Sequence, residues 1–199
     1  RAVKITALSG AHTFVGENVP NLLRLRKGGE FKAVLSTLCE AGFPYISWRT
    51  LNAQNFGLPQ DRERIIIVAS KILNIACSLH RPLFPVAKGK NHKVDGADGF
   101  YWTGGQRSIC YSSGYVPALK VGASPPKGGT SPVGVFYNSI VRKLSAIECV
   151  ALQGLKPKYF QGLIAGSVFR MAGNAVSRPV GRFAADTAAI EDKIDLEIV

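Results

Sequence analysis

Three hydrogen-bond donors stand at every second position of the segment LNAQNFGLPQDRERIIIVAS. They are Gln60, Arg62 and Arg64, and they directly precede the apolar run 65–69, which is typical of a strand. Because side chains two residues apart in an extended chain point to the same face, these donors could together bind an anionic or acceptor-rich ligand. The alternative is a charged rim in which the arginines pair with their acidic neighbours. Such a rim would contribute little stability.

Two further motifs place polar groups at predicted strand ends or turns. Glu17 stands in VGENVPNLL, and Asn174 stands in MAGNAVSRPV. Taken singly, the first could be an ordinary strand-end carboxylate and the second an ordinary turn before a helix. Their order is more specific, because ENV is followed by PQDRER, then by RKLSAIECVALQGLKP, then by GNAVSRPV. In this order the motifs resemble the closing motifs of the DNA (cytosine-5) methyltransferase family, over residues 13–70 and 138–187.

This resemblance implies a chemistry for the first two motifs. In the family a thiolate attacks C6 of cytosine, and negative charge spreads to N3 and O2 before C5 is methylated. Glu17 matches the ENV glutamate, which shares a proton with N3 and N4. Arg64 matches the second arginine of Q-x-R-x-R and would stabilise charge at O2, as a donor in an oxyanion site does. Gln60 and Arg62 match the first two members, which implies DNA contact for Gln60 and a role for Arg62 in holding the catalytic site together.

The resemblance also implies a cofactor. GNAV matches the family's last motif, which lies against S-adenosylmethionine, so Asn174, Ala175 and Val176 are the candidate cofactor-binding residues. We expect the chain to run there from a turn into a helix, whose first amides can meet polar atoms of the cofactor. Many members have serine where this chain has Ala175, which removes a hydroxyl contact. The preceding motif has a chiefly architectural role in the family and is matched by Arg142, Glu148, Gln153 and Gly154.

Between these motifs, residues 71–140 have the composition of a nucleic-acid surface. They hold eight basic residues against two acidic ones, with ten glycines, six prolines and eight aromatics. This composition favours short strands and loops, on which cations would meet phosphates and rings would stack or fill grooves. The family keeps its target-recognition region here and turns its base out of the duplex. Arg107, Lys120 and Lys127 are therefore candidate DNA contacts; the alternative is a loop-rich elaboration without a partner.

The elements that must position these residues alternate between strand and helix. TFVGENV, YISWRTLN and RIIIVAS are typical of strands, and apolar residues at i, i+3, i+4 and i+7 over 31–38 predict a helix that Gly42 would end. Ser145 and Glu148 form a capping-box pattern, with Gly154 as the stop, and Pro179 suits the first turn of a last helix. We expect an α/β fold: the later part of a Rossmann-like, S-adenosylmethionine-dependent methyltransferase mixed sheet with flanking helices, plus a small loop-rich β target-recognition lobe.

Charge and Gly/Pro content divide the 199 residues into three parts. Residues 1–70 are expected to form the C-terminal part of a catalytic domain. Residues 71–140 are expected to form the target-recognition region, and residues 141–199 a helical return to the catalytic domain.

The composition favours a soluble, intracellular protein with a polyanionic partner. Hydrophobic residues make up 46% of the chain, enough for a core. The 25 Lys+Arg against 13 Asp+Glu give a formal charge of +12, which suits double-stranded DNA. No apolar run approaches the ~18 residues that a membrane span requires. The four cysteines and three histidines are scattered, so we expect no metal site and free thiols in a reducing cytoplasm.

Two motifs of the family do not occur in this sequence. The nucleophile belongs to a Pro-Cys-Gln loop and the cofactor cradle to a glycine-rich turn, and here no cysteine follows a proline. We therefore expect the chain to correspond to the C-terminal part of the enzyme and to transfer no methyl group alone. Exposed sheet edges would then favour association with a complementing N-terminal methyltransferase chain; a truncated gene is the alternative.

Three functions are open at this point. The chain is the C-terminal portion of a methyltransferase, as a subunit of a split enzyme or otherwise, or it is a non-catalytic DNA-binding module. The third is an RNA cytosine-5 methyltransferase, since relatives of the family act on tRNA, but the long variable segment favours DNA.

Overall fold

The computed structural model describes residues 1–83, 96–103, 108–119 and 133–189. The chain divides into two compact units. Unit 1 comprises Arg1–Leu51, Glu63–Leu83 and Gly181–Val199, and unit 2 comprises Asn52–Arg62 and Phe84–Val180. This division differs from the three expected parts, because residues 52–62 and the helical residues up to 180 belong with the middle of the chain.

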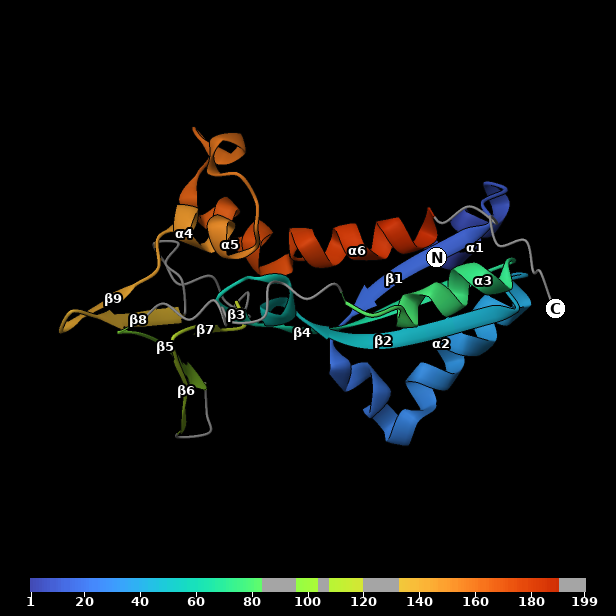
Figure 1. Ribbon diagram of the computed structural model, residues 1–199, viewed down its shortest axis with the longest axis horizontal. Helices are drawn as coiled ribbons and strands as arrows, with labels where there is room; N and C mark the ends of the chain where they lie inside the picture. The colour runs from blue at the N-terminus through green and yellow to red at the C-terminus, as the bar shows by residue number, and fades with distance from the viewer. Residues whose placement is uncertain (84–95, 104–107, 120–132, 190–199) are drawn as a thin grey trace. The chain divides into compact units, whose positions relative to one another are not determined.

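Unit 1 is built on a three-stranded sheet with the order β1-β4-β2 (Figure 1). The strands are β1 (Thr13–Asn18), β2 (Tyr45–Asn52) and β4 (Glu63–Ser70), so all three predicted strands are present. β1 and β4 are antiparallel, with a register that runs from Thr13 opposite Ser70 to Asn18 opposite Ile65. The β4 run is buried on both faces, which explains its continuous apolar sequence.

Helices flank this sheet. α2 (Gly29–Glu40) is the helix predicted from the 31–38 pattern, and Gly42 after it has φ +86°. Its buried Phe31 and Leu38 pack with Ile65 and Ile67 of β4 in one core. The other helical elements of unit 1 are α1 (Ala2–Leu8), η1 (Pro20–Leu23), η2 (Leu25–Gly28), α3 (Leu73–Cys77), η4 (Ser78–His80) and most of α6 (Arg178–Ala188).

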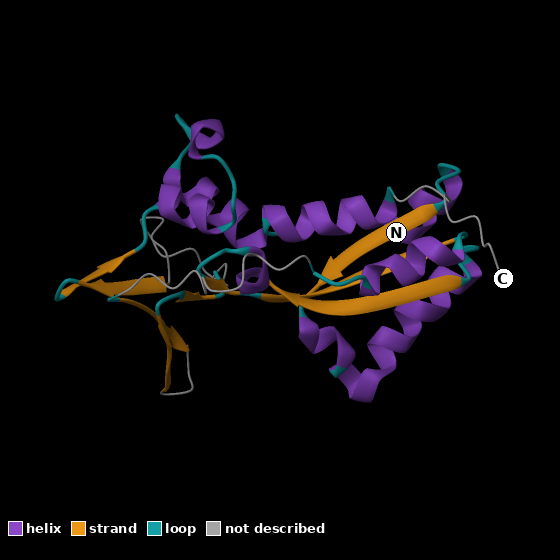
Figure 2. Cartoon of the chain, viewed as in Figure 1, coloured by secondary structure: helices purple, strands orange, loops and turns teal. Residues whose placement is uncertain are grey.

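Unit 2 combines small sheets with short helices (Figure 2). One sheet has four strands in the order β6-β5-β8-β9, and a second pairs β3 with β7 in parallel. Short strands were expected for this part of the chain. Their bounds are β3 (Gln60–Asp61), β5 (Ala97–Thr103), β6 (Ser108–Ser113), β7 (Val116–Pro117), β8 (Val133–Tyr137) and β9 (Ile140–Lys143).

The helices of unit 2 are η3 (Ala53–Phe56), α4 (Ala146–Leu152), η5 (Pro157–Phe160) and α5 (Ala165–Asn174). α4 begins with the predicted capping box between Ser145 and Glu148, and Gly154 follows it with φ +71°. Val133 of β8 shares a core with Val150 of α4 and Val168 of α5. This core places α4 and α5 in unit 2, so the described residues after 140 join unit 1 only from Gly181 in α6.

Three cysteines of the described residues, Cys39, Cys77 and Cys149, are free thiols. Among the residues that the structure describes, no group of three potential metal ligands comes together. Within those same ranges, no helix has both the length and the apolar character needed to cross a membrane.

Candidate active site

The structure brings Glu17 and Arg64 together on one face of the unit 1 sheet. Arg64 Nε lies 2.8 Å from Glu17 Oε1. The register explains the contact: Glu17 stands opposite Ile66, and Arg64 precedes Ile66 by two residues, so its side chain leaves the same face at a diagonal position. Local alternation in two paired strands thus places a carboxylate and a guanidinium side by side.

The pair lies in a partly closed environment. The side chains of Arg64 and Glu17 are 14% and 25% exposed, and Arg64 Nη1 donates a second hydrogen bond to the Glu63 carbonyl oxygen at 2.6 Å. Burial lowers the pKa of Arg64 from its usual range, and the charge and hydrogen bond of Glu17 act in the opposite direction. Arginine remains protonated in proteins, so the arrangement offers a fixed positive charge next to the carboxyl group of Glu17.

Gln60 is not placed as the sequence predicted. Its side chain is fully buried in unit 2, where Nε2 donates to the Leu152 carbonyl at 3.0 Å and Oε1 lies 3.5 Å from the Leu119 amide nitrogen. A buried side chain with both ends engaged is not available to DNA. The expected DNA contact through Gln60 is therefore corrected to a supporting role.

Arg62 is also buried, with 2% of its surface exposed. Its guanidinium donates to three carbonyl oxygens, those of Leu119 at 3.1 Å, Gly173 at 3.0 Å and Ala175 at 2.8 Å. These bonds tie the β3 segment to the end of α5 within unit 2. A buried guanidinium with these partners has no direct access to a substrate, and a role for Arg62 in holding the catalytic site together stays a prediction.

The predicted common face for the three donors is wrong. β3 ends at Asp61 and β4 begins at Glu63, so the extended segment is interrupted at Arg62. Gln60 and Arg62 point into the core of unit 2, whereas Arg64 points to Glu17 in unit 1. Arg64 does not follow the charged-rim alternative either, because its guanidinium pairs with Glu17 and binds Glu63 through the backbone carbonyl.

The candidate cofactor residues lie between two helices. Asn174 is the last residue of α5, and α6 begins at Arg178, so Asn174 stands at a helix C-terminus and not next to the N-terminus that we expected. The Ala175 amide donates to the Met171 carbonyl at 2.9 Å, which removes it as a cofactor donor. Asn174 and Val176 are exposed. One accessible amide side chain and one apolar side chain can contact an edge of a cofactor, but they cannot enclose it.

A buried polar network supports this turn. Gln153, fully buried, donates from Nε2 to the Ala172 carbonyl at 2.7 Å and accepts from the Ser177 hydroxyl at 2.7 Å. The Gln153 carbonyl accepts from the Arg178 amide at 2.8 Å. Ser177 was not among the predicted residues. Its position directly before Arg-Pro at a helix start was the signal that could have identified it.

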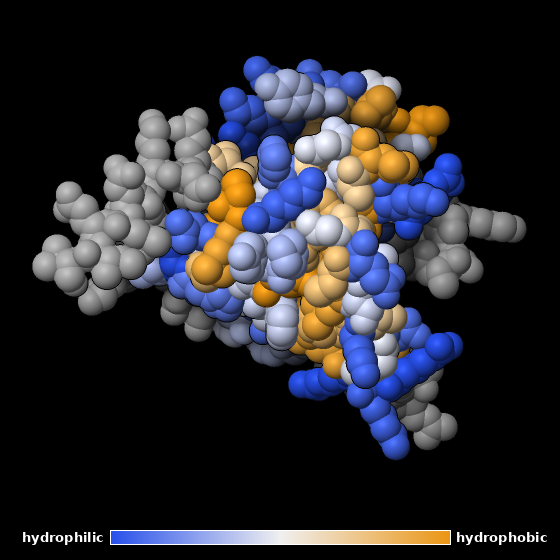
Figure 3. Space-filling model, turned by 90° about the vertical axis from the view of Figure 1, so that its right-hand side faces the viewer, coloured by the Kyte–Doolittle hydropathy of each residue, from blue (hydrophilic) through white to orange (hydrophobic). Residues whose placement is uncertain are grey.

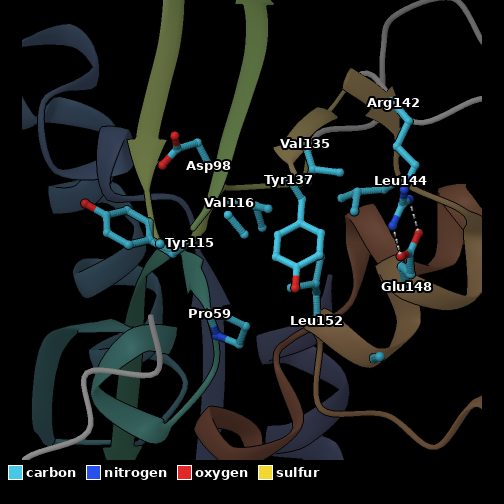
Figure 4. Close-up of a pocket in the computed structure, with 13 residues that line it drawn as sticks. Pro59, Asp98, Tyr115, Val116, Val135, Tyr137, Arg142, Leu144, Glu148 and Leu152 are labelled. Atoms are coloured by element: carbon cyan, nitrogen blue, oxygen red, sulfur yellow. Dashed lines mark hydrogen bonds and ion pairs between the residues drawn. The ribbon is translucent and has the colours of Figure 1, made fainter. Parts of the chain in front are cut away.

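A separate cavity of about 390 Å³ lies within unit 2 (Figure 4). Its lining is mainly apolar and comes from the β-sheet strands, α4 and Pro59, with Tyr137 projecting into it. At one side, Arg142 and Glu148 form a two-bonded ion pair at 2.8 and 2.6 Å. None of the predicted catalytic or cofactor residues lines this cavity. The ion pair joins β9 to α4, which agrees with the architectural role expected for both residues.

Three predicted DNA contacts fall outside the described residues. Arg107, Lys120 and Lys127 lie in the ranges 104–107 and 120–132. Their candidacy stays a prediction from composition.

Comparison with known proteins supports the interpretation of the motifs. Residues 2–98 match the family model described as C-5 cytosine-specific DNA methylase. The type II methyltransferase M2.BsuMI of Bacillus subtilis (strain 168) is 34% identical over 182 residues, which cover 84% of this chain and 46% of the relative. The type II methyltransferase M.Bsp6I of Bacillus sp. (strain RFL6) is 29% identical over 194 residues, covering 83% of this chain and 61% of the relative.

Solved structures agree with the fold. The Entamoeba histolytica methyltransferase EhMeth superposes with a TM-score of 0.53 at 14% identity, covering 89% of this chain and 62% of that protein. At this identity the likeness concerns the fold, a methyltransferase α/β architecture. The chain spans about half the length of the curated relatives it matches. With the motifs in family order and the Glu17–Arg64 pair in place, the chain belongs to the cytosine-5 DNA methyltransferase family.

Proposed function

We propose that this chain is the C-terminal portion of a DNA (cytosine-5) methyltransferase that acts on a cytosine turned out of double-stranded DNA. The observation that supports this most directly is the 2.8 Å contact between Arg64 and Glu17. In this proposal unit 1 contributes to the catalytic part, and residues 71–140, with α4 and α5 as their support, contribute to target recognition.

The two side chains of the pair would interact with different atoms of the base. Arg64 supplies a fixed positive charge for the oxygen at C2, where negative charge develops during attack at C6. Glu17 holds or shares a proton at N3 and the exocyclic amine. A base that enters the site would replace part of the existing ion pair, and because the pair is partly buried, the new hydrogen bonds would be stronger than in open water.

Arg62 and Gln153 would position the turn that contains Asn174 and Val176, because they hydrogen-bond backbone carbonyls around it. Gln60 would support the same unit through its bond to the Leu152 carbonyl, next to Gln153. S-adenosylmethionine, when bound, supplies the electrophilic methyl group. Asn174 would hydrogen-bond its polar edge and Val176 would contact its apolar surface.

The remaining catalytic groups would come from residues outside this sequence. Among the described residues, β1 pairs with β4 on one side and with no strand on the other. Val15 on β1 and Leu8 on the adjoining α1 are 39% and 79% exposed. An open strand edge with apolar neighbours fits further strands of the same sheet, supplied by a complementing chain or a longer polypeptide. We propose that the nucleophilic cysteine arrives with them and that this chain alone is inactive.

A non-catalytic DNA-binding module is the second candidate. The exposed Tyr111 and Tyr137 on the unit 2 sheet favour it, since aromatic rings on a basic protein can stack on bases.

A reconstitution experiment separates the two candidates. The chain is co-expressed with the N-terminal half of a related methyltransferase that carries the Pro-Cys-Gln loop, and transfer of a labelled methyl group to mixed-sequence duplex DNA is measured. We expect no transfer by the chain alone, transfer by the pair, and a loss of about 10²–10³-fold for Arg64→Gln, the usual effect of removing one oxyanion donor.

Arg182→Gln is the matched control, because it removes a largely exposed guanidinium from unit 1, and it should retain parent activity. Turnover by the isolated chain would contradict the missing nucleophile. DNA binding without methylation in the reconstituted pair would favour the non-catalytic module, and full activity of Arg64→Gln would refute the assigned site.

A further inference from the structure

An exposed turn of unit 1 contains basic side chains that the proposed chemistry does not use. It follows β1 and η1 and precedes α2, and its residues Arg24, Arg26 and Lys27 define what we call the basic turn. All three are exposed, and the side chain of Arg26 is 84% exposed. In Figure 3, long hydrophilic side chains, drawn in blue, project at the lower edge of the view, where the segment before α2 lies in Figure 1.

The backbone of the basic turn has an unusual conformation. Arg26 and Lys27 have φ/ψ values of 48°/44° and 55°/37°, and Gly28 follows with φ +88°. Left-handed conformations are unfavourable for residues with a Cβ atom. Glycine would make this reversal with less strain. The fold therefore explains the turn but not the two long cationic side chains that occupy it.

The charge of the basic turn is only partly balanced. Glu30 on the first turn of α2 lies 2.9 Å from Arg26, and this pair is exposed on both sides. Lys32 adds a further positive charge nearby in the sequence. Exposed ion pairs contribute little free energy, so Arg26 can exchange Glu30 for another anion at small cost. What results is a surplus of accessible positive charge on a turn with a fixed backbone.

We infer that the basic turn binds the phosphodiester backbone of double-stranded DNA. The inference rests on the proposed function, because DNA as substrate is what makes phosphate the expected anion. The turn follows the strand that holds Glu17, so a phosphate contact there would help to fix the duplex relative to the catalytic unit. Contacts of this kind position a duplex and do not read its sequence. The contact is thus separate from the target-recognition region.

The test compares the salt dependence of DNA binding. The variant Arg24→Gln/Arg26→Gln/Lys27→Gln removes the charges of the basic turn and keeps side-chain length. The control Lys4→Gln/Lys71→Gln/Arg182→Gln removes the same charge from other exposed positions of unit 1. Binding of a fluorescent mixed-sequence duplex is titrated between about 50 and 200 mM salt. We expect the log–log slope to fall by about 0.9 per lost phosphate contact in the turn variant, and to change far less in the control.

Equal slopes for the parent and the turn variant would overturn the inference, and so would equal decreases in both triple variants, which show a general charge effect. If the turn variant is misfolded by circular dichroism, Arg26→Gly/Lys27→Gly replaces it, because glycine suits both left-handed positions. A parent-like slope in that variant would also overturn the inference.

The inference and the proposed function can fail separately. A reduced slope without methyl transfer in the reconstituted pair would leave the DNA contact standing and remove the enzyme. Methyl transfer with an unchanged slope would do the reverse. Absence of salt-dependent duplex binding by the parent, or turn-dependent binding to phosphatidylserine vesicles in place of DNA, would reject DNA as the partner of the basic turn.

Discussion

Arg62 and Arg64 are two residues apart, but their side chains differ in burial and in the groups that they bind. Arg62 is 2% exposed and binds carbonyl oxygens, whereas Arg64 pairs with Glu17 at a partly open site. Their spacing predicts a shared face only if the strand is continuous. The interruption at Arg62 brings its side chain to the other unit, and no glycine or proline marks that break in DRER. The pairing of Arg64 with Glu17 could therefore be predicted from the motifs, whereas the direction of the Arg62 side chain could not.

Glu148 provides a pH-dependent contribution to stability. The hydrogen bonds of Arg142 lower the pKa of Glu148 from 4.5 to about 2, against the opposing effect of burial, and Ser145 contributes further hydrogen bonds. A carboxylate whose pKa is depressed in the folded state stabilises that state above its unfolded pKa and loses this contribution as pH falls through the folded pKa. The relevant window is therefore from about pH 4.5 down to about pH 2.

We expect Glu148→Gln to flatten the dependence of unfolding free energy on pH within this window. Urea denaturation at successive pH values measures it. Glu40→Gln, at an exposed position near the end of α2, is the control and should keep the parent profile. Parallel profiles for the parent and Glu148→Gln would show that the ion pair makes no net contribution.

At the scale of elements, Gln153 connects the ends of three helices. It follows α4, binds the Ala172 carbonyl of α5 through its side chain, and receives the Arg178 amide of α6 on its own carbonyl. Gly154 next to it has positive φ, and a Cβ added there would lie 3.1 Å from Pro179. The LQG motif is thus a joint between helices, which is a structural reason for the architectural role that the family resemblance implies.

We expect Gln153→Met to destabilise unit 2 by about 3 kcal/mol, because it leaves the Ser177 hydroxyl and the Ala172 carbonyl without this partner, at about 1–3 kcal/mol for each buried group. Thermal or urea unfolding measures the loss. Gln161→Met, at an exposed position, should change stability by less than about 0.5 kcal/mol.

A second variant sharpens this test. Gln153→Met/Ser177→Ala removes one of the two orphaned groups, so it should be more stable than Gln153→Met alone. If the double variant is less stable by the sum of the single effects, the hydroxyl does not act through Gln153.

Elements with local signals were predictable, and those that depend on distant pairing were not. The capping box of α4 and the apolar pattern of α2 lie within a few residues, and both helices formed as expected. α5 was missed because its sequence AGSVFRMAGN contains two glycines, which lower helix propensity. The parallel pairing of β3 with β7 joins residues 60 and 116, a contact for which neither segment carries a local signal. The Glu17–Arg64 pair was found through motif order, since spacing alone could not bring positions 17 and 64 together.

At the scale of the whole molecule, each of the two units has a hydrophobic core among its described residues. Leu38 and Phe43 belong to the core of unit 1, and Val133 and Val150 belong to that of unit 2. The proposed catalytic pair depends on the first core through β4, and the helix joint at Gln153 depends on the second. Segments with their own cores can open independently, which gives different protection from hydrogen exchange in different parts of one protein.

We expect core mutations to act within their own unit. Leu38→Ala and Leu144→Ala remove the same side chain from the two cores, where the residues are 0% and 7% exposed, and each should cost about 2–5 kcal/mol. Leu38→Ala should accelerate amide exchange in β1 and β4 more than in β5 and β8, and Leu144→Ala should do the reverse. Hydrogen exchange measured by mass spectrometry on both variants resolves these strands. Equal acceleration in both sheets by either variant would mean that the chain opens as one cooperative body, in which case loss of either core would disrupt the Glu17–Arg64 site and the Gln153 joint together.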